Sequence, residues 1–83
     1  MPFHVYIIEC NDGKLYTGIT TDLKRRIQQH NSGNGCRFTK FRHPVKLVYS
    51  EEASGRPEAL RREAAIKCLE RQQKLRLIGR NSG

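Results

Sequence analysis

Runs of β-branched and aromatic residues predict strands at three places in the chain. Residues 3–10 read FHVYIIEC and residues 14–19 read KLYTGI, and both segments are typical of strands. The Asn-Asp-Gly sequence between them favours a tight turn, because these residue types tolerate positive φ, so we expect an antiparallel hairpin. Gly18 weakens the second strand and marks a place where another chain or a ligand approaches the backbone closely. Residues 44–49 alternate apolar and polar side chains, which predicts a third strand.

Apolar residues at helical spacing predict three helices in the rest of the chain. A first helix follows a threonine N-cap at position 20 or 21 and ends near residue 30, with Leu23 and Ile27 on its buried side. Pro57 suits the first turn of a second helix. The face of this helix that we expect to be buried carries Leu60, Ala64, Ala65 and Cys68, broadened by Ile66 and Leu69. A third helix over residues 72–78 should pack Leu75 and Ile78 against the core.

The resulting order, ββαβαα, indicates an α+β fold in which helices flank a small three-stranded antiparallel sheet. A length of 83 residues allows one domain, so we assign residues 1–83 to it, with a core over about 3–78 and a frayed tail at 79–83. No apolar run reaches the roughly 18–20 residues of a membrane span, and the N-terminus lacks a signal-peptide pattern. We therefore expect a cytoplasmic protein without a membrane partner.

The three cysteines, Cys10, Cys36 and Cys68, are an odd number without a close pair. This spacing disfavours a disulfide scaffold or a zinc finger and favours free thiols in a reducing compartment, with a nucleophilic Cys–His pair as the minor alternative.

Charge narrows the class of partner. The chain carries 16 Lys and Arg against 8 Asp and Glu, a net charge of +8. Residues 24–46 contain seven basic residues and no acid, and the segment after Glu70 is again basic without an acid. A one-signed surface attracts polyanions, of which nucleic acid is the commonest. A solvated basic face without a partner remains the plain alternative.

Two tyrosines and an arginine are the first candidates for chemistry. Tyr6 and Tyr16 share parity on the two hairpin strands, so in a hairpin without a bulge both point to the same face of the sheet. Arg26 follows on the next helix. Two phenols and a guanidinium could converge on one phosphate. Cross-strand packing of the tyrosines and a solvent-facing arginine form the competing interpretation.

Glu63 and His30 are the next candidates. Glu63 lies near the edge of the expected apolar face of the second helix, among basic residues, where it could pair with Lys67 at i,i+4 or give an oxygen ligand to a hard divalent cation. His30 lies four residues after Arg26, on the same helix face, and could contact phosphate or end the helix.

The sequence around the tyrosines resembles the GIY-YIG nuclease superfamily. Val5-Tyr6-Ile7 precedes Tyr16-Thr17-Gly18 by about ten residues, and a helix with Arg26 follows. Residues 60–67 (LRREAAIK), with Lys74 and Leu77-Ile78 beyond them, are similar to the small single-domain bacterial branch of that superfamily. Val5 stands where the family has the first glycine, and Thr17 stands where it has the central isoleucine. The resemblance covers nearly the whole chain.

The resemblance implies a divalent-metal-dependent endonuclease. Glu63 matches the glutamate that holds one Mg²⁺ or Mn²⁺ ion, and Arg26 matches the catalytic arginine that neutralises charge in the transition state. Tyr16 would take a proton from the attacking water, directly or relayed, while Tyr6 orients it, and the basic surroundings together with a nearby metal should lower the phenol pKa for this task. His30 matches a position that often holds His or Tyr, and Gly18 matches the glycine that closes the second tripeptide.

A non-catalytic DNA- or RNA-binding module is the alternative function, and a protein-interaction or membrane-surface domain is a third. We expect a nucleic-acid partner, with DNA favoured over RNA, and a protein partner could supply target specificity. The residues expected to contact nucleic acid are Gly18, Lys24, Arg25, Arg37, Lys40, Arg42, Lys67, Arg71 and Lys74.

Overall fold

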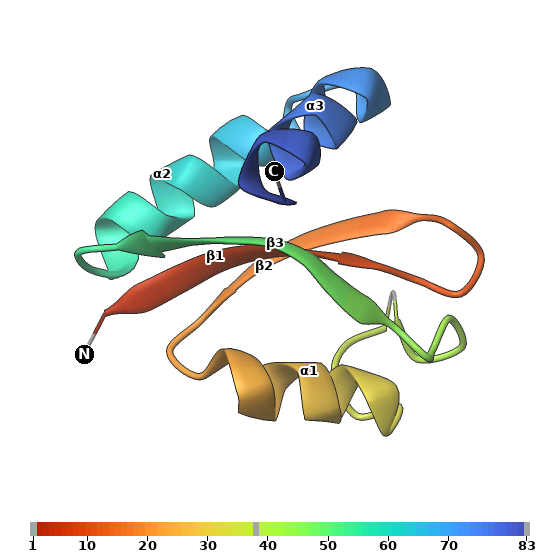
Figure 1. The fold of residues 1–83 in the computed structure, drawn as a ribbon. Coiled ribbons are helices and arrows are strands. Elements are labelled where there is room, and N and C mark those ends of the chain that lie inside the picture. Colours follow the sequence, from red (N-terminus) through yellow and green to blue (C-terminus); the bar gives the residue numbers. More distant parts are fainter. Residues whose placement is uncertain (1, 38, 83) are drawn as a thin grey trace.

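The computed structural model describes residues 2–37 and 39–82, and for residues 80–82 it describes the backbone alone. Within these residues the elements follow the predicted order ββαβαα (Figure 1). The bounds are β1 Phe3–Glu9, β2 Leu15–Thr20, α1 Leu23–Asn31, β3 Lys46–Ala53, α2 Arg56–Lys67 and α3 Arg71–Ser82. The α+β fold with a three-stranded antiparallel sheet is confirmed.

The first strand is the centre of the sheet, whose order is β2-β1-β3, and both of its neighbours run antiparallel to it. Because β1 has a strand on each side and helices over both faces, Val5, Tyr6, Ile7 and Ile8 are at most 1 % exposed. The hairpin register pairs Tyr6 with Gly18. The second strand is an edge strand, and its outer side is therefore free of ladder hydrogen bonds to a further strand of this sheet.

The helices form two layers, with α1 under one face of the sheet and α2 and α3 over the other (Figure 1). The cores follow this division. On the α1 side Tyr6, Ile8, Cys10 and Val45 are buried, with Tyr16, Leu23 and Ile27 packed against them. On the other side Val5, Ile7, Tyr49, Ala59 and Ile66 form the second core. The first helix is positioned as predicted, with Leu23 and Ile27 facing the sheet.

The start of α1 differs from the expected threonine cap. Asp22 is the N-cap, and its side-chain Oδ1 accepts a hydrogen bond from the backbone N–H of Arg25 at 3.1 Å. Thr20 instead accepts from the N–H of Asp22 through its hydroxyl at 3.1 Å. A carboxylate satisfies a free N–H at the positive end of the helix and is worth about 1 kcal/mol, which explains why aspartate rather than threonine takes the cap.

The buried face of α2 was predicted wrongly. Leu60 is 41 % exposed, and Ala64, Ala65 and Cys68 are also exposed. The residues that face the sheet are Ala59 and Ile66, each fully buried. Apolar residues occur on every side of this helix, so periodicity did not select one face; the small side chain of Ala59 lets the helix approach the sheet closely. This rotation turns Glu63, midway between Ala59 and Ile66, toward the sheet.

Two elements are longer than the sequence indicated. The third strand begins at Lys46 and continues to Ala53, because Glu51 and Glu52 pair with β1 despite their charge. Glu51 is balanced by Arg62, whose Nε lies 2.9 Å from its carboxylate. The third helix continues past residue 78 to Ser82. Leu75 was expected in the core but is 44 % exposed, whereas Leu77 and Ile78 pack against the core. Within the described residues, no helix is long and apolar enough to cross a bilayer.

Candidate active site

Tyr6 and Tyr16 come together on the α1 side of the sheet, as their shared parity predicts. Their ring centroids lie 6.5 Å apart, and the ring of His30 lies 6.0 Å from Tyr6 and 5.5 Å from Tyr16. Tyr6 is 1 % exposed, while Tyr16 on the edge strand is half-buried. The three rings form an aromatic cluster in which the Tyr16 ring, on the edge strand, is partly exposed to solvent.

Gly18 has a specific packing reason to be glycine. A Cβ placed there would lie 2.6 Å from the Tyr6 hydroxyl and 2.8 Å from Cζ of the same ring. The end of the Tyr6 ring and its hydroxyl therefore lie directly against Gly18 on β2. The Tyr6 ring makes the close approach to the backbone that the sequence indicated. Gly18 is itself buried, and the predicted contact with nucleic acid stays a prediction.

A chain of hydrogen bonds holds the Tyr6 hydroxyl in place. His30 Nε2 lies 3.0 Å from Tyr6 Oη, and His30 Nδ1 lies 2.7 Å from the hydroxyl of Thr39. Thr39 donates to the backbone carbonyl of Cys36 at 3.4 Å. With its proton used there, Thr39 accepts from Nδ1–H, and Nε2 is left to accept from Tyr6. This pattern requires a neutral imidazole.

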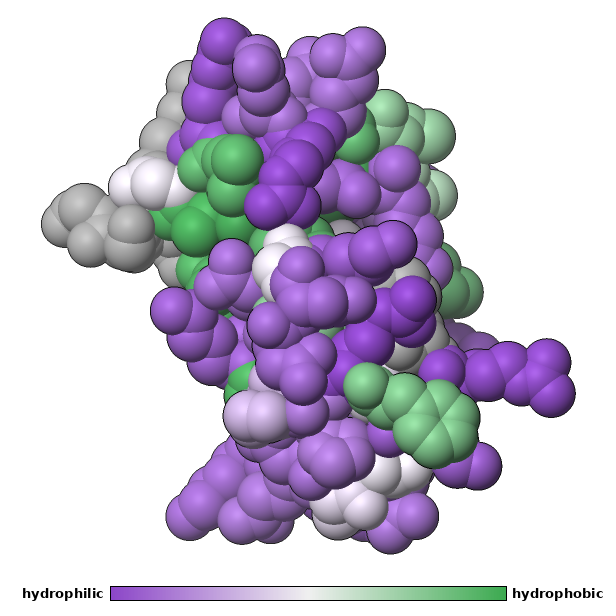
Figure 2. Space-filling view, turned by 90° about the vertical axis from the view of Figure 1, so that its right-hand side faces the viewer, coloured by the Kyte–Doolittle hydropathy of each residue, from purple (hydrophilic) through white to green (hydrophobic). Residues whose placement is uncertain are grey.

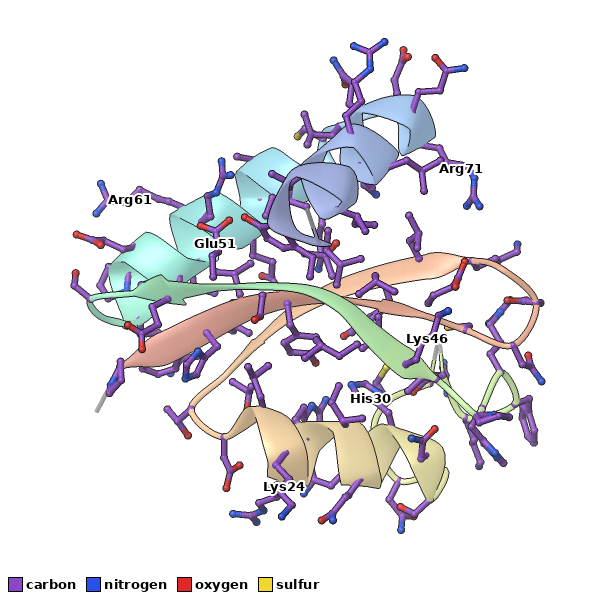
Figure 3. All side chains as sticks on the ribbon, viewed as in Figure 1. Lys24, His30, Lys46, Glu51, Arg61 and Arg71 are labelled. Carbon is purple, nitrogen blue, oxygen red and sulfur yellow. The ribbon has the colours of Figure 1, made fainter. Side chains whose placement is uncertain are left out.

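His30 lies inside the protein. It is fully buried and points from α1 toward the sheet (Figure 3), so its ring presents no surface to a phosphate in this structure. Burial and the charge of Arg26 lower the pKa of His30 to about 4, which keeps it neutral at pH 7. Gly35 leaves room for it, since an added Cβ would collide with Nδ1 of the ring.

Sequence reasoning missed the loop residues that complete this chain. Thr39 is fully buried and Cys36 is half-buried, and both lie between α1 and β3, where no periodic pattern marks a site. Cys36 hydrogen-bonds Tyr16 as well as Thr39. A threonine and a cysteine near several glycines looked like ordinary loop composition. Only the fold brings them to the aromatic cluster.

Arg26 joins the cluster from the same helix as His30. Its guanidinium hydrogen-bonds the Tyr6 hydroxyl and, at 3.0 Å, Oε1 of Gln29. Burial opposes its charge, but the Tyr6 hydrogen bond and the nearby phenols outweigh this effect and raise the pKa of Arg26. A half-buried, permanently charged guanidinium fixed by two neutral partners keeps donors free for an anion.

Burial sets the pKa values of both tyrosines in the protein without a metal. Burial raises the pKa of Tyr16 well above that of a free phenol, a hydrogen bond with Cys36 adds to this effect, and the charge of Arg26 only partly opposes it. Burial likewise raises the pKa of Tyr6, against the hydrogen bond from Arg26. Basic surroundings alone do not lower these pKa values, because desolvation of the phenolate is the larger effect. Lowering by a nearby metal stays a prediction.

Glu63 reaches this region from the opposite layer. It lies on α2, its side chain is 19 % exposed, and its Oε2 is 3.6 Å from Nζ of Lys67, the pair expected at i,i+4. Its charge is near enough to contribute, as the smallest of the causes, to the raised pKa of Tyr6. The Tyr6 hydroxyl and Glu63 thus approach the edge strand from its two faces.

The donor set fits a divalent cation that keeps most of its water. Within the part of the chain that the structure describes, no three His, Cys, Asp or Glu side chains gather, so these residues offer no all-protein cage. Glu63 supplies one accessible carboxylate. Thr17, on the α2 side of β2, has the one buried side-chain oxygen or nitrogen without a hydrogen-bond partner among the described residues. One carboxylate, with water and substrate phosphate completing an octahedron, suits Mg²⁺ or Mn²⁺.

Two of the other basic residues predicted to contact nucleic acid form ion pairs with acids. Arg42 pairs with Asp12 at 3.0 Å and Lys67 with Glu63, so both are partly neutralised. Lys24 points away from the sheet (Figure 3). The exposed members are Lys24, Arg25, Arg37, Lys40 and Arg71. They lie on the outer side of α1, in the loop after it and at the start of α3.

A basic hollow lies beyond the tyrosines, at the end of the sheet formed by the β1–β2 turn. It has a volume of about 310 Å³ and is lined by Lys14, Leu15, Arg71 and Lys74. Arg71 is fixed by a hydrogen bond from its Nη1 to the carbonyl of Gly13 at 3.1 Å. Figure 2 shows that the surface on this side of the molecule is largely hydrophilic. Lys14, which the sequence analysis did not select, joins two residues that it did.

Several known proteins are similar to this chain in sequence and in fold. The GIY-YIG catalytic domain family matches residues 2–76. A UPF0213 protein of Streptococcus agalactiae is 51 % identical over 94 % of this chain and 89 % of its own length, and one of Staphylococcus haemolyticus is 53 % identical over 90 % and 92 %. The solution NMR structure of a UPF0213 protein from Bacillus halodurans is similar, with a TM-score of 0.65 and 43 % identity over 100 % of this chain and 88 % of that one.

Proposed function

The chain belongs to the GIY-YIG catalytic domain family, and from this premise we propose that it is an endonuclease that hydrolyses nucleic-acid phosphodiester bonds with Mg²⁺ or Mn²⁺. The observation that carries the proposal is the convergence of Tyr6, Tyr16 and Arg26 at the edge of the sheet. Glu63 faces the same edge strand from the other layer.

Arg26 is the proposed phosphate ligand. Its charge persists at any pH at which the protein is folded, and its partners Tyr6 and Gln29 hold it in one orientation. Negative charge grows on the phosphoryl oxygens during hydrolysis, and a preorganised guanidinium stabilises that charge without reorientation. Tyr6, which is buried, acts here by positioning Arg26 rather than by orienting water, and His30 positions Tyr6.

Tyr16 is the proposed partner of the attacking water. With its pKa raised by burial and Cys36, its phenol is protonated at neutral pH and can donate or relay a hydrogen bond. It removes a proton only when a cation near its oxygen lowers that pKa. We therefore assign Tyr16 to positioning the water, with proton transfer reserved for the complex with metal and substrate.

Glu63 is the residue that would hold the divalent ion. When bound, such an ion supplies charge neutralisation at the scissile phosphate and at the leaving oxygen. Lys67, at 3.6 Å, balances the carboxylate when no ion is present.

DNA is the proposed substrate, in preference to RNA, and the exposed cations of α1, the following loop and α3 are its proposed contacts. Backbone contacts of this kind give affinity without sequence preference, so a protein partner would supply target choice. A binding module that does not cut is the second candidate, and the raised pKa of Tyr16 is the observation that favours it.

Nicking of supercoiled plasmid tests the proposal. The wild-type protein should nick with Mg²⁺ or Mn²⁺ and stop when a chelator is added. Arg26→Ala and Tyr16→Phe should each lower the nicking rate by about a hundredfold or more. Arg61→Ala removes an exposed arginine of α2 that has no proposed role in cleavage, and it should leave the nicking rate unchanged. A protein that binds DNA and RNA tightly but cuts neither under these conditions would establish the binding module instead.

A further inference from the structure

Phe41 stands out among the apolar side chains that the function above does not use. It is 85 % exposed, about twice the value of the next large apolar side chains that the structure describes, Leu75 at 44 % and Leu47 and Leu60 at 41 %. Single exposed apolar residues are common on protein surfaces, so the surroundings of this ring decide whether it has a role.

Those surroundings are positively charged. Nζ of Lys40 lies 5.5 Å from the centroid of the Phe41 ring, and Arg37 in the same loop is exposed. Arg42 follows directly, and the nearby carboxylate of Asp12 is engaged with it at 3.0 Å. An aromatic ring among cations offers stacking to a base and charge to the adjoining phosphates, the combination that single-stranded nucleic acid requires.

The backbone on both sides of Phe41 is fixed. Thr39 is buried and bonded to His30 at 2.7 Å. Arg42 donates its N–H to the carbonyl of Thr39 at 3.0 Å, and its own carbonyl accepts from the N–H of Asn11 at 2.9 Å. The ring is thus presented between two anchors, which reduces the entropy lost when it binds a ligand. Thr39 also belongs to the chain that holds Tyr6, so Phe41 lies two residues from the candidate site.

We propose that Phe41 stacks on an unpaired base of the nucleic-acid substrate, beside the strand that enters the candidate site. This inference rests on the nucleic-acid part of the proposed function and narrows it. The favoured substrate is a strand with an unpaired base near the cleavage point, such as a single-stranded end or a bulge, rather than uniform duplex. Stacking is tolerant of base identity because every base has a π face, so no sequence preference arises from this contact.

Binding without cleavage tests this inference separately from catalysis. The full-length protein is titrated, in chelator, into oligonucleotides that carry 2-aminopurine either in a single-stranded overhang or in a fully paired duplex. The wild type should quench the overhang fluorescence. Phe41→Ala should weaken overhang binding by about five- to a hundredfold with little change for duplex, Phe41→Trp should retain the binding, and Leu60→Ala, an exposed apolar control on α2, should behave as wild type.

The outcomes separate the two proposals. Phe41-dependent overhang binding in a protein that never cuts would keep the stacking role and reject the nuclease. Cleavage that is unaffected by Phe41→Ala, with equal binding of overhang and duplex, would reject the stacking role alone. Equal losses on overhang and duplex would also reject it, and would indicate that Phe41 serves another surface, such as a protein contact. Failure to bind any oligonucleotide would reject both.

Discussion

Protonation of His30 should destabilise the folded protein progressively under mild acid. The ring is fully buried, and its Nε2 accepts from Tyr6, an arrangement that a second ring proton breaks. Burial, followed by the charge of Arg26, lowers its pKa from 6.5 to about 4. In the unfolded chain His30 binds a proton near pH 6.5, whereas in the folded protein it binds one only near pH 4. The free energy of unfolding therefore falls as pH falls from 6.5 to about 4.

The size of the effect follows from the two pKa values. Each tenfold difference in protonation corresponds to about 1.4 kcal/mol, so the gap between 6.5 and about 4 amounts to about 3 kcal/mol at most. Small domains are stable by only about 5–15 kcal/mol. The loss should be complete by about pH 4 and absent above pH 7, so it begins well above the pH at which ordinary carboxylates titrate, about pH 4.

Urea unfolding of wild type and His30→Gln, measured from pH 7.5 to pH 4, isolates the effect. Carboxylates and the other histidines are common to both proteins, so the difference between the two curves reports His30. We expect the wild type to lose stability between pH 6.5 and 4 relative to the variant. Should the variant not fold, the NMR titration of the His30 ring in the wild type replaces it. Parallel stability curves, or a ring that titrates at pH 6 or above, would refute the reasoning.

Further predictions concern packing, capping and charge. Gly18→Ala should lower the free energy of unfolding in urea by about 1–3 kcal/mol, because its Cβ would lie 2.6 Å from the buried Tyr6 hydroxyl. The control Gly79→Ala, whose Cβ meets nothing within 4 Å, should be neutral or stabilise by up to about 1 kcal/mol. Equal effects of the two substitutions would contradict the close packing of Tyr6 against Gly18. Asp22→Ala should cost about 1 kcal/mol by thermal unfolding, and an unchanged midpoint would show that the cap is dispensable. Replacing Arg71 and Lys74 together by alanine should reduce the slope of log affinity against log salt by about 2 if each contacts a phosphate, whereas an unchanged slope would remove the hollow from the binding surface.

The sequence carried enough information for the hairpin side of the site. Period-two parity placed Tyr6 and Tyr16 on one face, and helical spacing placed Arg26 and His30 on one side of α1. These are local relationships within an element or between adjacent strands. They hold whatever the rest of the chain does.

The other half of the site depends on tertiary packing that local patterns do not encode. Apolar residues occur on every side of α2, so the sequence pattern does not show which side faces the sheet. That orientation is set by the close approach of Ala59 to the sheet. Thr39 lies in a loop that has no periodic pattern of apolar residues, and its part in the site is visible only from its contact with His30. The tyrosine pKa values depend on burial in the finished fold, which outweighs the basic composition. Counting the nearby basic residues alone therefore gave the wrong direction for the tyrosine pKa shifts.

Cleavage by Glu63→Gln, compared with wild type across a range of Mg²⁺ and Mn²⁺ concentrations, is the most direct test of the central claim. Glu58→Gln, an exposed acid on the same helix, is the matched control. We predict that wild type and Glu58→Gln cut a labelled duplex with an overhang only when the ion is present, while Glu63→Gln binds the same DNA but does not cut it at any ion concentration. Cleavage by Glu63→Gln at the wild-type rate, or a wild type that binds and never cuts, would contradict the claim.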